Sequence, residues 1–386
     1  MKTRRNIYIM FAISFLHGMV FYGPIATLYR QAAGVSVLQI TLIESLSLAL
    51  CIGLEMPWGM VADRIGYRKT LIVCSGIYFL SKIVFWRADS FFDFLLERIL
   101  LSVVLAGFSG CDVSLLYLSC KEEESQKVFG IYQFFGMAGL LGASLLYSVS
   151  IGENYRLAGF LTMVSYGAAA VLAFGIREVK PAELGRGNNQ NFIRVFLATV
   201  GDRRFLLAVI GMGLLAETNQ TITVFLNQIQ YVKAGIDVKT MGLIYILVTL
   251  CGMAGMWSHW FTKKMGGISF SLTMFLGGGI SCVVLAVTSQ AVVSVAAIVM
   301  LRLCASLFAP FSTQLQNRRI KTEDRATALS IYAVLLEGTG VVTNVIIGQA
   351  AQENISWAMG CGAILCLAGA MMFYLFYRRE GRRLEI

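Results

Sequence analysis

The chain has 386 residues, of which 57% are hydrophobic and 14% are charged, and its formal net charge is +10. A soluble domain carries about 25% charged residues, so this composition excludes an ordinary soluble globular protein. The Lys and Arg residues lie almost wholly in short links between apolar runs. No basic helix or basic-aromatic patch is present, which excludes nucleic acid as a partner.

The apolar residues come in repeated runs of roughly 20 residues, the length of α-helix that spans about 30 Å of hydrocarbon. We therefore expect an all-α polytopic membrane protein embedded in the lipid bilayer. The first run is too long for a signal peptide and lacks a cleavage site, so it is expected to stay as the first span. In chain order, twelve spans are predicted at residues 6–28, 38–62, 70–88, 91–118, 128–150, 155–176, 204–230, 240–262, 268–289, 291–316, 326–350 and 354–377.

One long polar break divides the spans six and six. It predicts an N-terminal six-helix bundle over residues 1–176, a cytoplasmic central loop over 177–203, and a C-terminal six-helix bundle with a short basic tail over 204–386. Two halves of six spans suggest internal duplication.

The basic residues also predict the orientation. Links after even-numbered spans and both termini are rich in Lys and Arg, whereas links after odd-numbered spans contain few. We expect the basic side to face the cytoplasm of a bacterial cell, with the chain in the inner membrane and both termini inside.

The nine cysteines are scattered singly, without a CxxC motif. They predict neither a disulfide framework nor a metal site. The HExxH, GxSxG and P-loop motifs are absent from any plausible site. We therefore expect no catalytic residues, no enzyme activity and no cofactor, and we expect a monomer.

The strongest motif is GMVADRIGYRK at residues 59–69, between the second and third spans. It resembles the G-x-L-A-D-R-x-G-R-K-x motif of the major facilitator superfamily. The resemblance implies two pseudo-symmetric six-helix bundles and a secondary transporter. An acidic side chain at the end of the second span can accept hydrogen bonds from a helix N-terminus or an arginine, which would hold one side of the protein shut. We interpret the motif as a gating latch. The alternative is that its basic residues only anchor the loop. The residues of the motif are Gly59, Asp63, Arg64, Gly66, Arg68 and Lys69.

Ionisable residues deep in a span cost roughly 2.5–3.5 kcal/mol on insertion scales, so each is a candidate for function. In the first half these include His17, Lys82, Arg98 and Asp112. Arg98 aligns with the arginine of the superfamily's R-x-x-x-G motif, which is associated with proton-coupled members, although a serine stands at the glycine position. Each of these residues also has a purely structural alternative. Arg98 could form a salt bridge with Glu97 or another glutamate, Asp112 could hold helices together, and His17 could be an interior histidine whose hydrogen bonds are made within the protein.

In the second half, polar residues gather in the seventh span. Glu217 and Gln220, and Gln220 and Asn227, are spaced to share one helix face, with Asn219 close by. We interpret this stripe as a substrate wall, with Glu217 as a proton carrier; the alternative is hydrogen bonding between helices. Arg302 and Glu337 fall near the midplane of the tenth and eleventh spans. Pairing of the two side chains would lower the free-energy cost of placing their charges inside the membrane.

The leading hypothesis is proton-coupled export of amphipathic or drug-like small molecules, with protons as the coupling ion. A promiscuous cavity suits the many Met and aromatic residues. One alternative is proton-linked uptake of a small anionic or polar metabolite held by Arg98 and Arg302. Another is a membrane sensor on a transporter fold that moves no solute.

Overall fold

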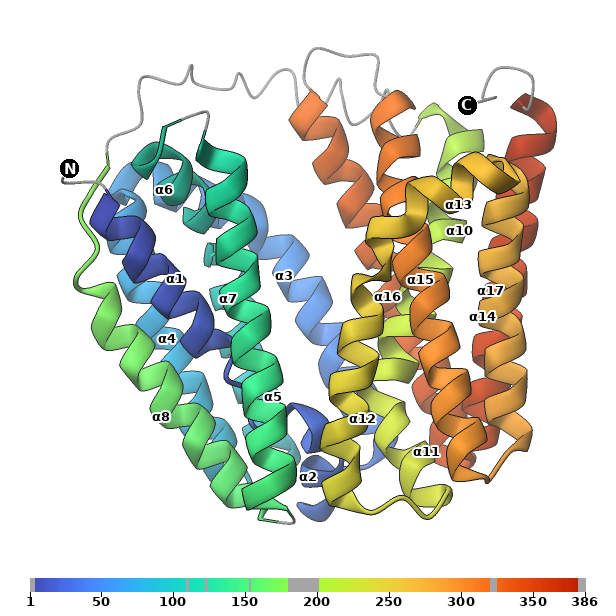
Figure 1. The fold of residues 1–386 in the computed structure, drawn as a ribbon, viewed down its shortest axis with the longest axis horizontal. Helices are drawn as coiled ribbons and strands as arrows, with labels where there is room; N and C mark the ends of the chain where they lie inside the picture. Colours follow the sequence, from blue (N-terminus) through green and yellow to red (C-terminus); the bar gives the residue numbers. More distant parts are fainter. Residues whose placement is uncertain are drawn as a thin grey trace. The chain divides into compact units, whose positions relative to one another are not determined.

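The computed structural model describes residues 4–108, 111–121, 124–152, 154–179, 201–319 and 325–380. Within these ranges, twelve helical stretches are long and apolar enough to cross a membrane (Figure 1). The predicted twelve spans and the all-α polytopic fold are therefore confirmed. Most of the predicted central loop at 177–203 lies outside the described residues.

The chain forms two compact units. Unit 1 consists of Met1–Ser36, Leu46–Leu184 and Val238–Ile246, and unit 2 consists of Val37–Ser45, Gly185–Asp237 and Leu247–Ile386. Most of each unit comes from one half of the chain, and the first turns of the second and eighth spans are the exceptions.

The first six spans contain α1 (Arg4–Gly18), η1 (Gly23–Ile25), α2 (Ala26–Ala32), α3 (Val37–Ile65), α4 (Tyr67–Arg87), α5 (Phe91–Phe108), α6 (Cys111–Ser119), α7 (Ser125–Leu146), η3 (Tyr147–Ile151) and α8 (Tyr155–Ala173). The last six contain α10 (Arg203–Gln220), η4 (Thr221–Leu226), α11 (Asn227–Lys233), α12 (Val238–Cys251), η5 (Gly252–Trp257), α13 (Ser258–Met265), α14 (Gly267–Val287), α15 (Ala291–Arg319), α16 (Arg325–Glu353) and α17 (Ile355–Glu380). Helices are the expected solution because a backbone in hydrocarbon must satisfy its own hydrogen bonds.

Two glycines make the tight reversals at matching places in the two halves of the chain. Gly66, between α3 and α4, has φ +91°, and Gly266, between α13 and α14, has φ +77°. A side chain at such a positive φ would be strained, so glycine is required at both turns. The repeated backbone conformation agrees with the duplication that the sequence suggests.

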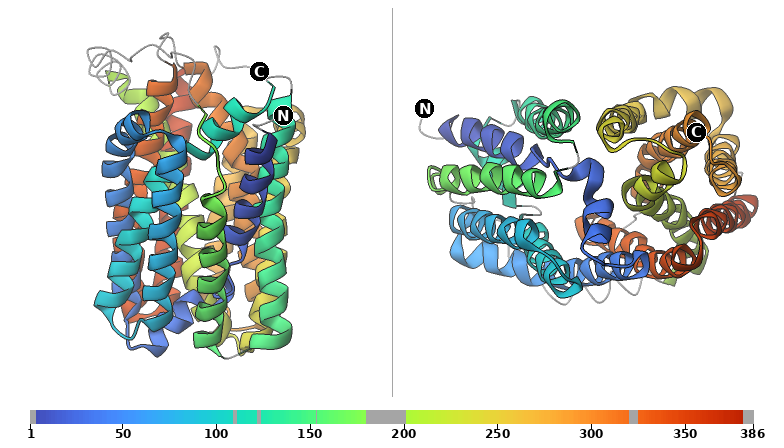
Figure 2. Two further views of the ribbon diagram at one scale, coloured as in Figure 1. Left: turned by 90° about the vertical axis from the view of Figure 1, so that its left-hand side faces the viewer. Right: turned by 90° about the horizontal axis from the view of Figure 1, so that it is seen from below.

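Small residues bring α1 and α7 into close contact in unit 1. A Cβ atom placed on Gly18 would overlap the carbonyl oxygen of Gly136, and one on Gly139 would overlap the carbonyl oxygen of Phe15. Helices approach this closely only where glycine removes the side chain. The left-hand view of Figure 2 shows α8 (green), which packs against both α1 and α4.

Unit 2 is built around aromatic side chains. Phe275, Phe308 and Phe373 are buried, and their ring centroids lie 5.1–6.0 Å apart. Aromatic pairs at this spacing stabilise a core beyond the area that they bury. The result is a firm scaffold for the polar residues of the seventh and eleventh spans.

Candidate functional site

The first span is broken in its middle, between α1 and η1. A break at membrane depth persists only where other groups bind the freed backbone atoms. Polar side chains of α8 do this here: Thr162 Oγ1 accepts a hydrogen bond from the backbone N–H of Phe21 at 3.0 Å, and Tyr166 Oη donates to the carbonyl oxygen of His17 at 2.6 Å. The break is thus held in place by the sixth span.

The predicted candidate His17 lies at this break, among aromatic rings. Its ring centroid is 4.8 Å from that of Tyr78, 5.0 Å from that of Tyr166 and 5.5 Å from that of Phe108. Its Nε2 atom is buried, and no residue in the described part of the chain hydrogen-bonds to it. His17 is therefore an interior residue of unit 1 whose Nε2 atom has no hydrogen-bond partner among the described residues.

A buried ion pair lies beside the break. Lys82 Nζ is 2.7 Å from Glu97 Oε1, and the two side chains are only 2% and 1% exposed. The ammonium also donates to Tyr22 Oη at 2.8 Å, which joins the pair to the broken span. Four rings surround the ammonium at 5.4–5.9 Å from their centroids, those of Tyr22, Tyr78, Phe85 and Tyr166.

The positions of Lys82 and Glu97 in the sequence carry a signal for this pair. Lys82 and Glu97 stand at similar distances from the short link between α4 and α5. Consecutive antiparallel helices place such residues at the same depth. There the attraction between opposite charges offsets part of the free-energy cost of removing them from water. The sequence pattern alone presents Lys82 as one of several ionisable residues in the spans and Glu97 as a possible partner of Arg98.

Two other predicted residues of unit 1 have separate surroundings. Arg98 follows Glu97 on α5 and interacts with it electrostatically. Asp112 lies at the start of α6, where its Oδ2 accepts a hydrogen bond from Tyr132 Oη on α7 at 3.0 Å. Asp112 thereby ties α6 to α7.

The motif at residues 59–69 contacts the chain just after α8. Arg68 donates from Nε to the carbonyl oxygen of Ile176 at 2.7 Å, and its backbone N–H donates to Glu178 Oε1 at 3.4 Å. The Glu178 carboxylate also packs against the turn at Gly66, where a Cβ atom would lie 2.8 Å from Oε2. The motif thus fixes the link between the second and third spans to the end of the sixth. Of its other members, Arg64 and Lys69 are exposed, and the surroundings of Gly59 and Asp63 lie outside the described part of the chain.

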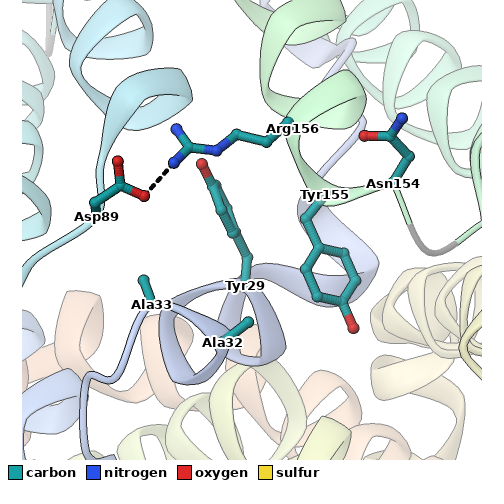
Figure 3. A pocket seen from close by; sticks show the side chains of 7 residues that line it. All are labelled: Tyr29, Ala32, Ala33, Asp89, Asn154, Tyr155 and Arg156. Carbon is teal, nitrogen blue, oxygen red and sulfur yellow. Dashed lines mark hydrogen bonds and ion pairs between the residues drawn. The ribbon is translucent and has the colours of Figure 1, made fainter.

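Unit 1 also carries a pocket of about 460 Å³ that no predicted residue lines (Figure 3). Arg156 forms an ion pair with Asp89, donates to the carbonyl oxygen of Trp86 at 2.6 Å, and lies over the ring of Tyr29 with its Cζ 5.8 Å from the centroid. The pair ties the link between α4 and α5 to the start of α8. The remaining lining residues are Ala32, Ala33, Asn154 and Tyr155.

In unit 2, the seventh span contains the densest run of buried polar residues in the described chain. Its middle, η4, is a π-helical segment, a form that occurs mostly as single turns at functional sites. This segment changes which residues share a helix face. Gln220 is exposed while Asn227 is buried, so the polar stripe predicted to join them is interrupted. The extra residue per turn explains why a seven-residue spacing does not keep these side chains on one face. The buried polar members are Thr218, Asn219, Thr221, Thr223, Asn227, Gln228 and Gln230.

Two predicted carboxylates lie on the neighbouring helices of spans seven and eleven. Glu217 on α10 and Glu337 on α16 are both half-buried, and their charges interact. The helices are close here, because a Cβ atom on Gly213 would overlap Oγ1 of Thr339. A proton or a cation bound between these carboxylates would remove their mutual repulsion.

A hydrogen-bonded pair reinforces the same helix contact one turn further on. Thr221 Oγ1 lies 2.5 Å from Oδ1 of Asn344 and 2.8 Å from the carbonyl oxygen of Glu217. Asn344 is 3% exposed, and sequence reasoning missed it because a lone asparagine in an apolar helix carries no periodic signal.

Arg302 lies on α15, against the eighth span. A Cβ atom on Gly252 would be 2.7 Å from its Nη2, so the guanidinium packs directly on the backbone where η5 begins. Its predicted role in substrate binding or coupling remains a prediction.

Twelve candidate spans among the described residues and the turn that recurs at Gly66 and Gly266 define a polytopic helical membrane protein. A family model described as Major Facilitator Superfamily matches residues 7–342, and the chain belongs to that family.

The named relatives agree with this membership. An uncharacterized MFS-type transporter of Methanocaldococcus jannaschii is 24% identical over 182 residues, which cover 45% of this chain and 46% of that protein. The match therefore spans about half the length of the relative. Among solved structures, the nucleoside transporter NupG has a TM-score of 0.81 at 13% identity, over 97% of this chain and 99% of that one. A bacterial homolog of the human lysosomal transporter Spinster has a TM-score of 0.76 at 14% identity, over 97% of each chain. At such identities, the likeness to solved structures shows the fold alone.

Proposed function

We propose that the protein is a secondary active transporter that moves a small organic molecule by alternating access, with proton-coupled export of amphipathic cations as its activity. The observation that carries this proposal is the pair of carboxylates at Glu217 and Glu337. A proton and a cationic substrate would compete for the same negative charge. Binding of either one would favour a different state of the protein, which couples the two fluxes.

The surroundings of this pair support the proposal. Glu217 lies one turn before the π-helical segment, a form that is frequent at functional sites. The buried amides and hydroxyls nearby can orient a substrate through hydrogen bonds, while Met and aromatic side chains accept varied apolar groups.

The test uses purified protein in liposomes with an imposed pH gradient and a fluorescent lipophilic cation. We expect gradient-driven dye movement in the wild type and its loss in Glu217→Gln. Glu337→Gln should weaken the coupling because the repulsion that favours proton binding is gone. The control is Glu353→Gln, which removes a carboxylate at the end of α16, and it should transport normally.

Two results would contradict the proposal. Dye movement that survives in Glu217→Gln would remove the proton from this residue. Absence of dye movement in the wild type would reject cation export. Nucleosides, which the name of the structural neighbour NupG gives as its substrates, would then be tested in the same liposomes.

We further propose that both termini face the cytoplasm of a bacterial cell. The distribution of Lys and Arg supports this orientation, since basic links stay on the side from which the chain inserts. Accessibility of single cysteines to an impermeant thiol reagent in intact cells would test it. Cysteines introduced near Lys263 should be protected, and ones near Lys239 should react.

A further inference from the structure

The eighth span does not continue straight to its end. Figure 1 shows α13 lying across the end of unit 2, not along the direction of α14, and the change of direction falls in η5. A 3₁₀ stretch inside a span marks such a change of helix path. The bent segment packs against α15, where a Cβ atom on Gly255 would lie 2.9 Å from the carbonyl oxygen of Ser306.

One face of this bent segment is buried and the other is exposed and apolar. Ser258 and Thr262 are only 3% and 7% exposed, because they face the helices of unit 2. The opposite face carries four large apolar side chains at i, i+3, i+4 and i+7, which are 51–74% exposed: Met253, Met256, Trp257 and Trp260.

The positive charges stand at the far end of this apolar face. Lys263 and Lys264 are exposed, and Lys264 Nζ lies 5.2 Å from the ring centroid of Trp260. No acidic side chain in the described ranges forms an ion pair with either lysine. Their charges are therefore available to a partner outside the chain.

We propose that η5 and α13 form an interfacial element that binds anionic phospholipid headgroups through Lys263 and Lys264. The segment closes a membrane span that runs from Val238 to Met265, so its last turns lie at headgroup depth. Trp side chains favour this interface, where the ring meets acyl chains and the indole N–H meets polar groups. A helix with an apolar aromatic face and lysines beside it lies in the membrane plane and is attracted to anionic lipid.

A lipid surface fits this face better than a protein partner does. The apolar stripe ends a candidate membrane span, and the two exposed lysines follow at the end of that span. The two lysines and the neighbouring rings give charge and shape complementarity to a phosphate with its acyl chains. This inference does not depend on the substrate or on proton coupling.

The experiment measures lipid retention by native mass spectrometry of the purified protein, titrated with phosphatidylglycerol or with phosphatidylcholine. A lysine near an anionic surface contributes about 1 kcal/mol, or roughly fivefold in binding. The Lys263→Gln/Lys264→Gln variant should therefore lose more than about tenfold in phosphatidylglycerol binding and little in phosphatidylcholine binding. Lys127→Gln, which removes an exposed lysine without a neighbouring tryptophan, is the matched control and should bind as the wild type does.

A second measurement places the tryptophans. In vesicles that contain phosphatidylglycerol labelled with a quencher below the headgroup, Trp260→Phe should lower the quenched fraction of the fluorescence. Equal phosphatidylglycerol binding by the wild type and the double variant would overturn the proposal. So would an equal loss in Lys127→Gln, or unchanged quenching in Trp260→Phe.

Discussion

Replacing Lys82 with methionine should destabilise the protein far more than the loss of an exposed lysine would. The Nζ and Oε1 atoms of Lys82 and Glu97 are 2.7 Å apart, and both side chains are almost completely buried. At an effective dielectric constant of 20, their gross attraction is roughly 6 kcal/mol. Desolvation of two charges offsets much of this, so the net contribution of the intact pair is small.

The single variant Lys82→Met leaves the Glu97 carboxylate buried without its counter-charge. Removal of one partner from a buried pair costs about 3–5 kcal/mol. Glu97→Leu should have a similar effect for the same reason. The double variant Lys82→Met/Glu97→Leu removes both charges, and its free energy of unfolding should return to within about 1 kcal/mol of wild type.

The assay is unfolding in mixed micelles by increasing SDS, followed by tryptophan fluorescence. Asp89→Asn is the control, because it breaks an ion pair with Arg156 whose side chains are 73% and 45% exposed. Exposed pairs contribute about 0–1 kcal/mol, so this variant should unfold almost as wild type. The reasoning is refuted if the single variants unfold like Asp89→Asn, or if the double variant is as unstable as the two single changes combined.

Two further predictions concern helix contacts. Gly139→Ala should destabilise the protein by about 1–3 kcal/mol in the same SDS titration, because its Cβ atom would overlap the carbonyl oxygen of Phe15. Gly142→Ala is the control and should be neutral, because a Cβ atom there meets no atom within 4 Å. Thr221→Val should lower the free energy of unfolding by about 1–3 kcal/mol, because the buried Asn344 side chain loses its hydrogen bond from Thr221. Faster hydrogen exchange in the middle of the seventh span would report the loss. An unchanged melting curve and exchange rate for Thr221→Val would show that this contact contributes nothing.

The sequence alone allowed the number, limits and helical nature of the spans to be predicted. These properties depend on local quantities: the length of each apolar run and the hydrogen-bonding needs of a backbone in hydrocarbon. Gly66 was named as a member of the motif, and a glycine suits the positive φ that the chain adopts there.

Partners between helices were decided by the tertiary structure. The Lys82–Glu97 pair, the contact of Thr221 with Asn344 and the repulsion between Glu217 and Glu337 each join residues from different spans. Which faces of the helices meet depends on packing, and the π-helical turn after Gln220 shifted the register that a regular helix would have kept. The sequence determined which polar residues lie inside the membrane, where each one is costly. The fold decided how they pair, because pairing requires a particular rotation of every helix against its neighbours.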